Sequence, residues 1–338
     1  MPSTAGPPRR PPGRRVLRAV VRSLAGLAVL GALLRALGPG ALGGALGVLS
    51  PATVVLALAA GLVATTAQAQ RWRLVARARG VRIPFREALG ECWAAGLVNL
   101  LLPGGVAGDA VRVLRRRRGG DTLPEAGVAV AGERLAGTSI LLAVGVVPAL
   151  AVGAWLAVAL AVGALAVGAV AWRATAGAPG RDRAAVWALS VLAWACYQGL
   201  FLVAGLRTAP DAAPGALWAT TVLGLAGMSV PLGVGGWGPR EGSTTLAALA
   251  HGLPAETGFA ISLGYGLLAL VSALPGAVLL ARWLRPGDPG AVPPRRRAGT
   301  GRPTAGTGAH GPGPAPPGGR DGSRAGSRRG GSAGPAAS

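Results

Sequence analysis

The sequence contains very little cysteine and histidine, and this scarcity excludes two kinds of site. Its 338 residues include two cysteines, Cys92 and Cys196, and two histidines, His251 and His310. Both cysteines lie within apolar stretches, so they form neither a disulfide framework nor a thiolate metal site. The histidines are far apart, and a structural metal site requires more donors than they supply. We therefore expect no metal site and no cofactor, and we interpret His251 as a residue at the membrane interface.

Lysine is absent, and aromatic residues make up only 4% of the chain, although the formal net charge is +22. The basic residues are all arginines, and Ala, Gly, Arg and Pro dominate the composition, which is typical of a bacterium with a GC-rich genome. A nucleic-acid interface would combine aromatic side chains for base stacking with basic side chains for phosphate contacts. The sequence shows no such pattern, so we expect no nucleic-acid partner and interpret the arginines as markers of membrane topology.

Charged residues are also scarce, at 14%, whereas 51% of residues are hydrophobic and the mean hydropathy is +0.48. Apolar blocks of about twenty residues alternate with short connectors that contain arginine. About twenty helical residues cross a hydrocarbon core of roughly 30 Å. The sequence therefore predicts an all-α, polytopic membrane protein. The predicted full spans are residues 16–37, 48–70, 126–150, 151–172, 185–206 and 259–281.

The two ends of the chain have a different composition. Residues 1–15 are rich in Pro and Arg, and residues 286–338 are rich in Pro, Gly, Ser, Ala and Arg. Neither segment can bury an apolar core, so we expect both to be disordered, on either side of a transmembrane domain at residues 16–285. Residues 16–37 resemble a secretory signal peptide, with a basic start and an apolar core. Because no clean cleavage site follows and many spans come after it, we favour an uncleaved signal-anchor.

The arginines orient the spans, because they collect on the cytoplasmic side of a membrane. Arginines precede the first span and follow the last one, so we predict that both termini are cytoplasmic and that the protein lies in the inner membrane. The apolar segment at 88–102 has arginines on both sides and should enter from the cytoplasm and return without crossing. Residues 216–253 should enter and return from the outside. About six full spans and two re-entrant broken helices result.

Both non-crossing segments are interrupted by proline and glycine. Each contains a proline, a Gly-rich bend and a charged pair near the start of a following helix, and the two enter from opposite faces. This similarity predicts an inverted repeat, as in many transporter folds. Irregular backbone at membrane depth needs polar surroundings, so both breaks should face one another or a shared cavity. The break residues are Pro103, Gly104, Gly108, Pro231, Gly235, Gly236 and Gly238.

Charged and polar residues near the breaks are the candidates for substrate binding, because charges within a membrane are costly and mark functional sites. The helices that begin near Asp109 and at Pro239 would present unpaired N–H groups to an anion such as phosphate. Arg240 and Glu241 lie away from any basic cluster, so we favour a functional role for them. The candidates are Asn99, Asp109, Arg112, Glu133, Arg134, Arg240 and Glu241.

Five of these candidates have a structural alternative. Asp109 could cap the helix that follows it, and Arg112 could be the first member of a cytoplasmic arginine cluster. Asn99 could satisfy carbonyl groups that the first break leaves free. Glu133 and Arg134 could pair with partners on a neighbouring helix. The sequence leaves both interpretations open for these residues.

Enzyme signatures do not occur in the transmembrane region. The Gly-rich stretch from Gly104 to Gly108 lacks the Lys-Ser/Thr ending of a phosphate-binding loop, and no strand precedes it as in a dinucleotide-binding turn. Residues 16–285 contain neither a G-x-S-x-G nor an H-E-x-x-H motif. The sequence thus leaves open whether the protein is an enzyme, and favours a protein that is not.

Several motifs occur in a fixed order between residues 16 and 285. They are Asn99, Pro103-Gly104-Gly105, Gly108-Asp109 and Arg112; then Glu133-Arg134-Leu135; then the segment from Pro231 to Glu241, Tyr265 and Pro275. In this order they resemble the lysylphosphatidylglycerol synthase transmembrane-region family, also called flippase-like domain proteins. The resemblance implies translocation of a lipid or a lipid-linked substrate, because the family includes the lipid-flipping portion of multiple-peptide-resistance factors.

Those factors also carry a soluble aminoacyl-transfer domain, whereas a low-complexity tail follows residue 285 here, so we do not expect lysyl transfer. We predict a translocase that binds an anionic head group in a central polar site. Its substrate would be an anionic phospholipid or a polyprenyl-linked lipid of the membrane. The alternative is a membrane-embedded enzyme acting on polyprenyl-linked sugars, or an accessory subunit of a partner membrane enzyme.

Overall fold

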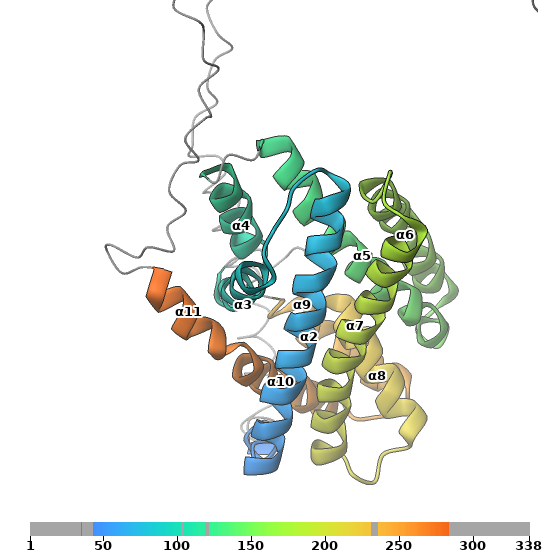
Figure 1. The fold of residues 1–338 in the computed structure, drawn as a ribbon. Helices are drawn as coiled ribbons and strands as arrows, with labels where there is room; N and C mark the ends of the chain where they lie inside the picture. The colour runs from blue at the N-terminus through green and yellow to red at the C-terminus, as the bar shows by residue number, and fades with distance from the viewer. Residues whose placement is uncertain (1–34, 36–42, 103–104, 119–121, 231–235, 284–338) are drawn as a thin grey trace, which may run out of the picture. The chain divides into compact units, whose positions relative to one another are not determined.

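The computed structural model describes residues 35, 43–102, 105–118, 122–230 and 236–283, and its regular elements there are α-helices joined by short turns (Figure 1). The predicted all-α fold of a polytopic membrane protein is confirmed. The predicted leader, the predicted tail and nearly all of the first predicted span lie outside the described residues. The helices are α2 (Pro51–Ala78), α3 (Phe85–Leu101), α4 (Ala107–Arg118), α5 (Leu123–Ala149), α6 (Ala154–Ala174), α7 (Gly180–Thr208), α8 (Pro214–Gly227), α9 (Pro239–Ala250), α10 (Ala255–Ala273) and α11 (Pro275–Trp283).

Five of the described helices, α2, α5, α6, α7 and α10, are long and apolar enough to cross a membrane. α5, α6 and α7 coincide closely with predicted spans, whereas α2 begins within the predicted span 48–70 but continues to Ala78. α6 is the most exposed of the five, with Trp155 70% and Leu165 75% exposed, and it packs mainly against α5. Apolar side chains on such a surface are expected where the surrounding solvent is lipid.

The last predicted span, residues 259–281, is two helices and not one. α10 ends at Ala273, and α11 begins at Pro275. Proline has no N–H to donate and its ring clashes with the preceding turn, so it ends the first helix and starts the second. α11 then packs against α3, where an added Cβ at Gly276 would lie 2.5 Å from the Trp93 carbonyl oxygen. α11 therefore supports the helix that precedes the first break.

Two pairs of short helices occupy the positions of the predicted non-crossing segments. α3 and α4 pack against each other, as do α8 and α9. These helices have 17, 12, 14 and 12 residues respectively. Each is shorter than the roughly 20 residues that a full crossing requires. Re-entry from opposite faces and the inverted repeat stay predictions.

Glycines allow close contacts within both pairs. A Cβ added to Gly108 on α4 would lie 2.2 Å from the Ala95 carbonyl oxygen on α3. A Cβ added to Gly224 on α8 would lie 2.4 Å from the Thr244 hydroxyl on α9. A Cβ atom would clash at these distances, so glycine at both positions allows each helix to pack closely against its partner.

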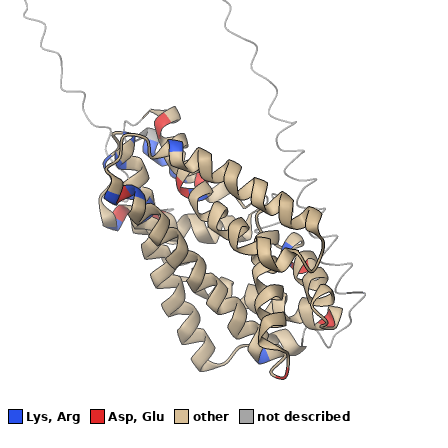
Figure 2. Ribbon diagram, turned by 90° about the vertical axis from the view of Figure 1, so that its right-hand side faces the viewer, with Lys and Arg blue, Asp and Glu red and all other residues tan. Residues whose placement is uncertain are grey.

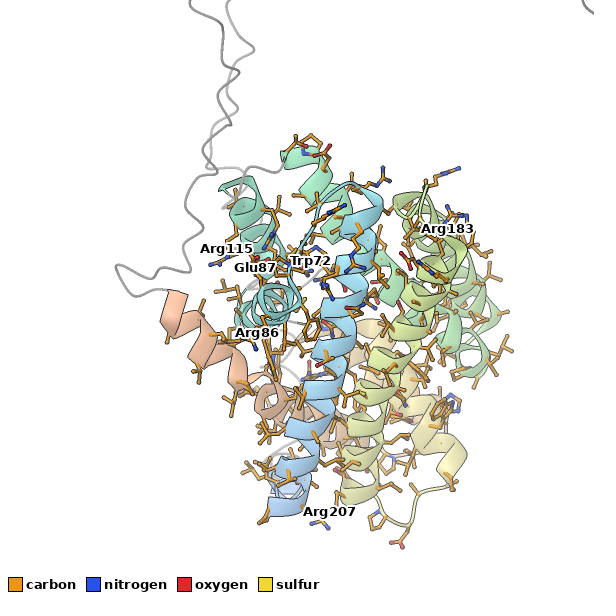
Figure 3. The ribbon with its side chains drawn as sticks, in the orientation of Figure 1. Trp72, Arg86, Glu87, Arg115, Arg183 and Arg207 are labelled. Atoms are coloured by element: carbon orange, nitrogen blue, oxygen red, sulfur yellow. The ribbon has the colours of Figure 1, made fainter. Side chains whose placement is uncertain are left out.

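Most charged residues lie towards one end of the described helices (Figure 2). Arginines of the α2 C-terminus, of α4, of the end of α6 and of the start of α7 contribute to this end, whereas Arg207 lies at the opposite end (Figure 3). Because cytoplasmic segments carry the excess of arginine, the charged end is predicted to be cytoplasmic.

Single cysteines should test this orientation. In a protein with Cys92 and Cys196 replaced by alanine, Gly43→Cys should react with an impermeant maleimide only from the outer face of oriented membrane vesicles. Ala178→Cys, in the turn between α6 and α7, should react only from the cytoplasmic face. Labelling of both positions from the same face would contradict the arginine-based topology and the inverted repeat with it.

Candidate functional site

A cavity of about 420 Å³ lies among α2, α3, α4, α5, α7, α8 and α10. Residues at both breaks contribute to its lining: Gly105 and Val106 at the first, and Gly236 at the second, together with Ser229 and Val230 just before it. These described residues therefore bring parts of both breaks to a shared cavity, as the sequence predicts. Charged and amide side chains on its lining are Arg71, Asn99, Asp109, Arg112, Glu133, Arg134 and Gln68.

Glu133 on α5 is the centre of a buried ion network. Its Oε1 accepts a hydrogen bond of 2.9 Å from Nε of Arg71 on α2, and Arg71 Nη2 contacts the same oxygen. Its Oε2 accepts a hydrogen bond of 3.2 Å from Arg112 Nη1 on α4. Arg71 also donates to the Ser190 hydroxyl on α7, at 3.0 Å. One carboxylate thus joins three helices, and a fourth is attached through Arg71.

Asp109 on α4 forms the second part of the network. Its Oδ1 accepts from Arg112 Nη1 at 3.2 Å, and its Oδ2 contacts Arg134 Nη1. Asn99 on α3 donates to the same Oδ2 at 3.3 Å, and its own Oδ1 accepts from the Gly108 N–H at 2.7 Å. Asp109 lies inside the first turn of α4, so the capping alternative for this residue is wrong. Among the described residues, Asn99 accepts from an N–H group and donates to Asp109, so the carbonyl partner of its structural alternative is not found there. Asn99 thereby occupies the Gly108 N–H, a donor that an anion could otherwise use.

Arg112 has unused hydrogen-bonding capacity on the cavity lining. It is only 4% exposed, and its guanidinium carbon lies 4.0 Å from the centroid of the Trp72 ring. Nη1 makes the two carboxylate contacts, whereas Nε and Nη2 have no hydrogen-bond partner among the described residues. A buried donor without a partner costs free energy, so these nitrogens favour an additional acceptor.

A neighbouring ion cluster ties α4 to α3 outside the cavity. Arg116 donates to Glu91 at 2.8 Å and also contacts Glu87, while Arg115 reaches Glu91 at 3.4 Å. Trp72, Glu87 and Arg115 lie together where α2, α3 and α4 meet (Figure 3). Burial opposes the charge of Arg116, but hydrogen bonding and attraction to Glu91 and Glu87 raise the pKa of Arg116 above its ordinary value. Arg116 therefore keeps its positive charge, and its contacts with Glu87 and Glu91 hold α4 against α3.

Arg240 and Glu241 on α9 form a separate, fully buried pair, both 0% exposed. Arg240 Nε donates to Glu241 Oε1 at 2.9 Å and to the Ser262 hydroxyl at 3.1 Å. The guanidinium carbon lies 4.3 Å from the Trp237 ring centroid and 5.3 Å from that of Tyr265. Tyr265 lines the cavity, whereas Arg240 and Glu241 do not. The pair thus sits behind the cavity wall, and its predicted role in substrate binding stays a prediction.

The second break depends on glycine and on Glu241. α9 begins with Pro239 at its first position, as predicted. Gly236 and Gly238 have φ values of 86° and 96°, which side chains disfavour. Glu241 Oε2 accepts the Gly238 N–H at 2.6 Å, so this donor is satisfied within the protein and is not offered to an anion. Pro103, Gly104, Pro231 and Gly235 lie outside the described residues.

Sequence reasoning missed Arg71 and Trp72 as parts of the site. Arg71 follows the predicted span 48–70 and belongs, by sequence, to a cytoplasmic arginine cluster. In the structure α2 continues to Ala78, so Arg71 lies within the helix and is only 5% exposed. The available signal was the helix-compatible pattern beyond residue 70, which places Arg71 on the same helix as the cavity residue Gln68, about one turn away.

The first break and the charged residues of the ion network lie in a part of the sequence that matches a known protein family. Residues 19–185 match the family described as "Lysylphosphatidylglycerol synthase TM region". A comparison with curated proteins gave no match. The matched residues include all of α2 to α6, but they do not include the segment from Pro231 to Glu241, Tyr265 or Pro275, where the resemblance stays a prediction. The match at residues 19–185 confirms the predicted family, and the chain is an integral membrane protein of the lysylphosphatidylglycerol synthase transmembrane-region family.

Proposed function

We propose that this protein translocates a lipid with an anionic head group across the inner membrane, and that the cavity is the head-group site. The substrate is an anionic phospholipid or a polyprenyl-linked lipid. The observation that carries the proposal is the unused donor capacity of Arg112, on the lining of a cavity among membrane helices.

The charge of the cavity supports an anionic ligand. Its lining contains three arginines and two carboxylates, which leaves one net positive charge. Charges interact more strongly in a weakly polar interior than in water, so an anion gains from this excess. A phosphate group supplies both the negative charge and the oxygen acceptors that an arginine fork binds.

Arg112→Lys should slow lipid transfer by about tenfold or more in liposomes. Lysine keeps the charge but cannot reproduce the guanidinium fork, and a hydrogen bond to a charged group contributes about 1.5–3 kcal/mol. Transfer of a chain-labelled anionic phospholipid would be followed by quenching of the outer leaflet with an impermeant reductant, with and without an imposed proton gradient. Arg82→Gln is the matched control, because Arg82 is exposed and lies outside the cavity.

Equal transfer by the unmodified protein, Arg112→Lys and Arg82→Gln would overturn the proposal. Melting temperatures must accompany the rates, so that unfolded protein is not scored as inactive. Mass analysis of the recovered lipids separates the two functions that the sequence left open. A new lipid species formed by the purified protein would identify an enzyme in place of a translocase.

A further inference from the structure

Two more residues of the cavity lining contain buried polar atoms without a partner. They are Trp194 on α7, through Nε1, and Ser229 just after α8, through Oγ. Neither atom has a hydrogen-bond partner among the described residues. An indole N–H can only donate, so Trp194 requires an acceptor, while a serine hydroxyl can either donate or accept. These two residues belong neither to the ion network nor to the Arg240–Glu241 pair.

The carboxylates of the lining are, in contrast, fully engaged. Glu133 accepts from Arg71 through one oxygen and from Arg112 through the other. Asp109 accepts from Arg112 through Oδ1, and Arg134 and Asn99 share its Oδ2. A head-group ammonium ion needs an anionic partner, and each carboxylate oxygen of this lining already has an arginine. The described lining therefore favours ligand oxygens and disfavours a ligand amine.

Trp194 lies about one helical turn from the ion network along α7. Ser190, which receives a hydrogen bond from Arg71, marks the level of the ion network on α7. Trp194 lies four residues further along the same helix, a rise of roughly 6 Å. The Trp194 ring is held edge-on against Trp218, with ring centroids 5.9 Å apart, so its position is fixed by packing. Arg112 and Trp194 line the same cavity, so a ligand whose phosphate contacts Arg112 can extend towards Trp194.

We propose that Trp194 and Ser229 form a subsite for head-group hydroxyls, so that the substrate is a phosphate ester of a polyol without an amine. A phosphoglycerol head group and a phosphosugar head group share this chemistry. The inference rests on the proposed function, because it assumes that the phosphate occupies the Arg112 end of the cavity. The subsite would select among anionic head groups by their hydroxyl groups, whereas the charge of the cavity selects only for an anion.

The test compares lipids that differ only in the head group. Chain-labelled phosphatidylglycerol, phosphatidic acid and phosphatidylethanolamine form one set, and polyprenyl phosphosugar and polyprenyl phosphate form the other. Phosphatidylglycerol should be transferred faster than phosphatidic acid, and phosphatidylethanolamine should be slowest. Trp194→Phe removes the N–H and keeps the ring, and Ser229→Ala removes the hydroxyl. Each should lower the rate ratio of hydroxylated to phosphate-only lipid about fivefold, the effect expected for one neutral hydrogen bond.

Trp155→Phe is the control, because Trp155 is 70% exposed on α6 and does not line the cavity. If the rate ratio falls in the variants for only one of the two lipid sets, phospholipids or polyprenyl lipids, that set contains the substrate class. Unchanged ratios in both sets, or transfer of phosphatidylethanolamine as fast as phosphatidylglycerol, would overturn the subsite. Failure of the proposed function has a different signature, because Arg112→Lys would then leave the transfer of every lipid unchanged.

Discussion

Replacing Glu133 with alanine should destabilise the folded protein by about 3–5 kcal/mol, because removal of one member of a buried ion pair leaves the other charge uncompensated. Glu133 is the shared partner of Arg71 and Arg112, and the three residues are 4–5% exposed. The variant would leave two buried guanidinium groups short of an acceptor, one on α2 and one on α4. The measurement is the melting temperature of the detergent-solubilised protein.

Glu125→Ala is the matched control on the same helix. Glu125 is exposed in the first turn of α5, and Thr122 is its side chain's one hydrogen-bond partner among the described residues, so its loss should cost no more than about 1 kcal/mol. Glu133→Asp should fall between the two, because a side chain one methylene shorter cannot reach both arginines equally well. A melting temperature of Glu133→Ala that equals that of Glu125→Ala would show that the network does not stabilise the fold.

Replacing Arg240 with alanine should cost a similar free energy of unfolding, about 3–5 kcal/mol, because it strands a fully buried Glu241. It also removes the guanidinium group that lies near the rings of both Trp237 and Tyr265. Since Tyr265 lines the cavity, we expect lipid transfer to be lost together with the support of the cavity wall. Glu241→Gln should be milder, because an amide oxygen can still accept from Arg240 or from Gly238.

Arg207→Ala is the control for this experiment. Arg207 is exposed near the end of α7 (Figure 3), so its loss should change the free energy of unfolding by no more than about 1 kcal/mol. Melting temperature and lipid transfer should be measured on the same preparations. If folded Arg240→Ala and Glu241→Gln both transfer lipid at the unmodified rate, the second break is not part of the working site.

The sequence predicted the breaks because proline and glycine act locally. Pro239 stands at the start of α9, and Gly236 and Gly238 have the positive φ angles that the Gly-rich bend implies. Pro275 also interrupts a helix locally, but it lies within an apolar run of about twenty residues, and that run predicts a single span. Hydropathy over such a window does not register a single proline, so the boundary between α10 and α11 was missed.

The ion network could not be predicted in this way. Arg71 and Glu133 are separated by 62 positions in the sequence, and Arg112 and Glu133 by 21. Whether two such charges meet depends on the rotation of each helix about its axis and on the closeness of packing. The 2.2 Å distance between a Cβ at Gly108 and the Ala95 carbonyl oxygen shows how closely α4 must approach α3 for Asp109 to lie beside Asn99.

By itself, the sequence determined that this protein is all-α, that it lies in a membrane, approximately where α5, α6 and α7 begin and end, and where the two breaks fall. These properties depend on composition and residue type within short windows, because the bilayer acts on each segment separately. Only the tertiary structure decided that Arg71 joins the site, that Arg112 keeps unused donors, and that Arg240 and Glu241 lie behind the cavity wall. Those outcomes depend on which helix faces touch, and a pattern within one helix does not contain that information.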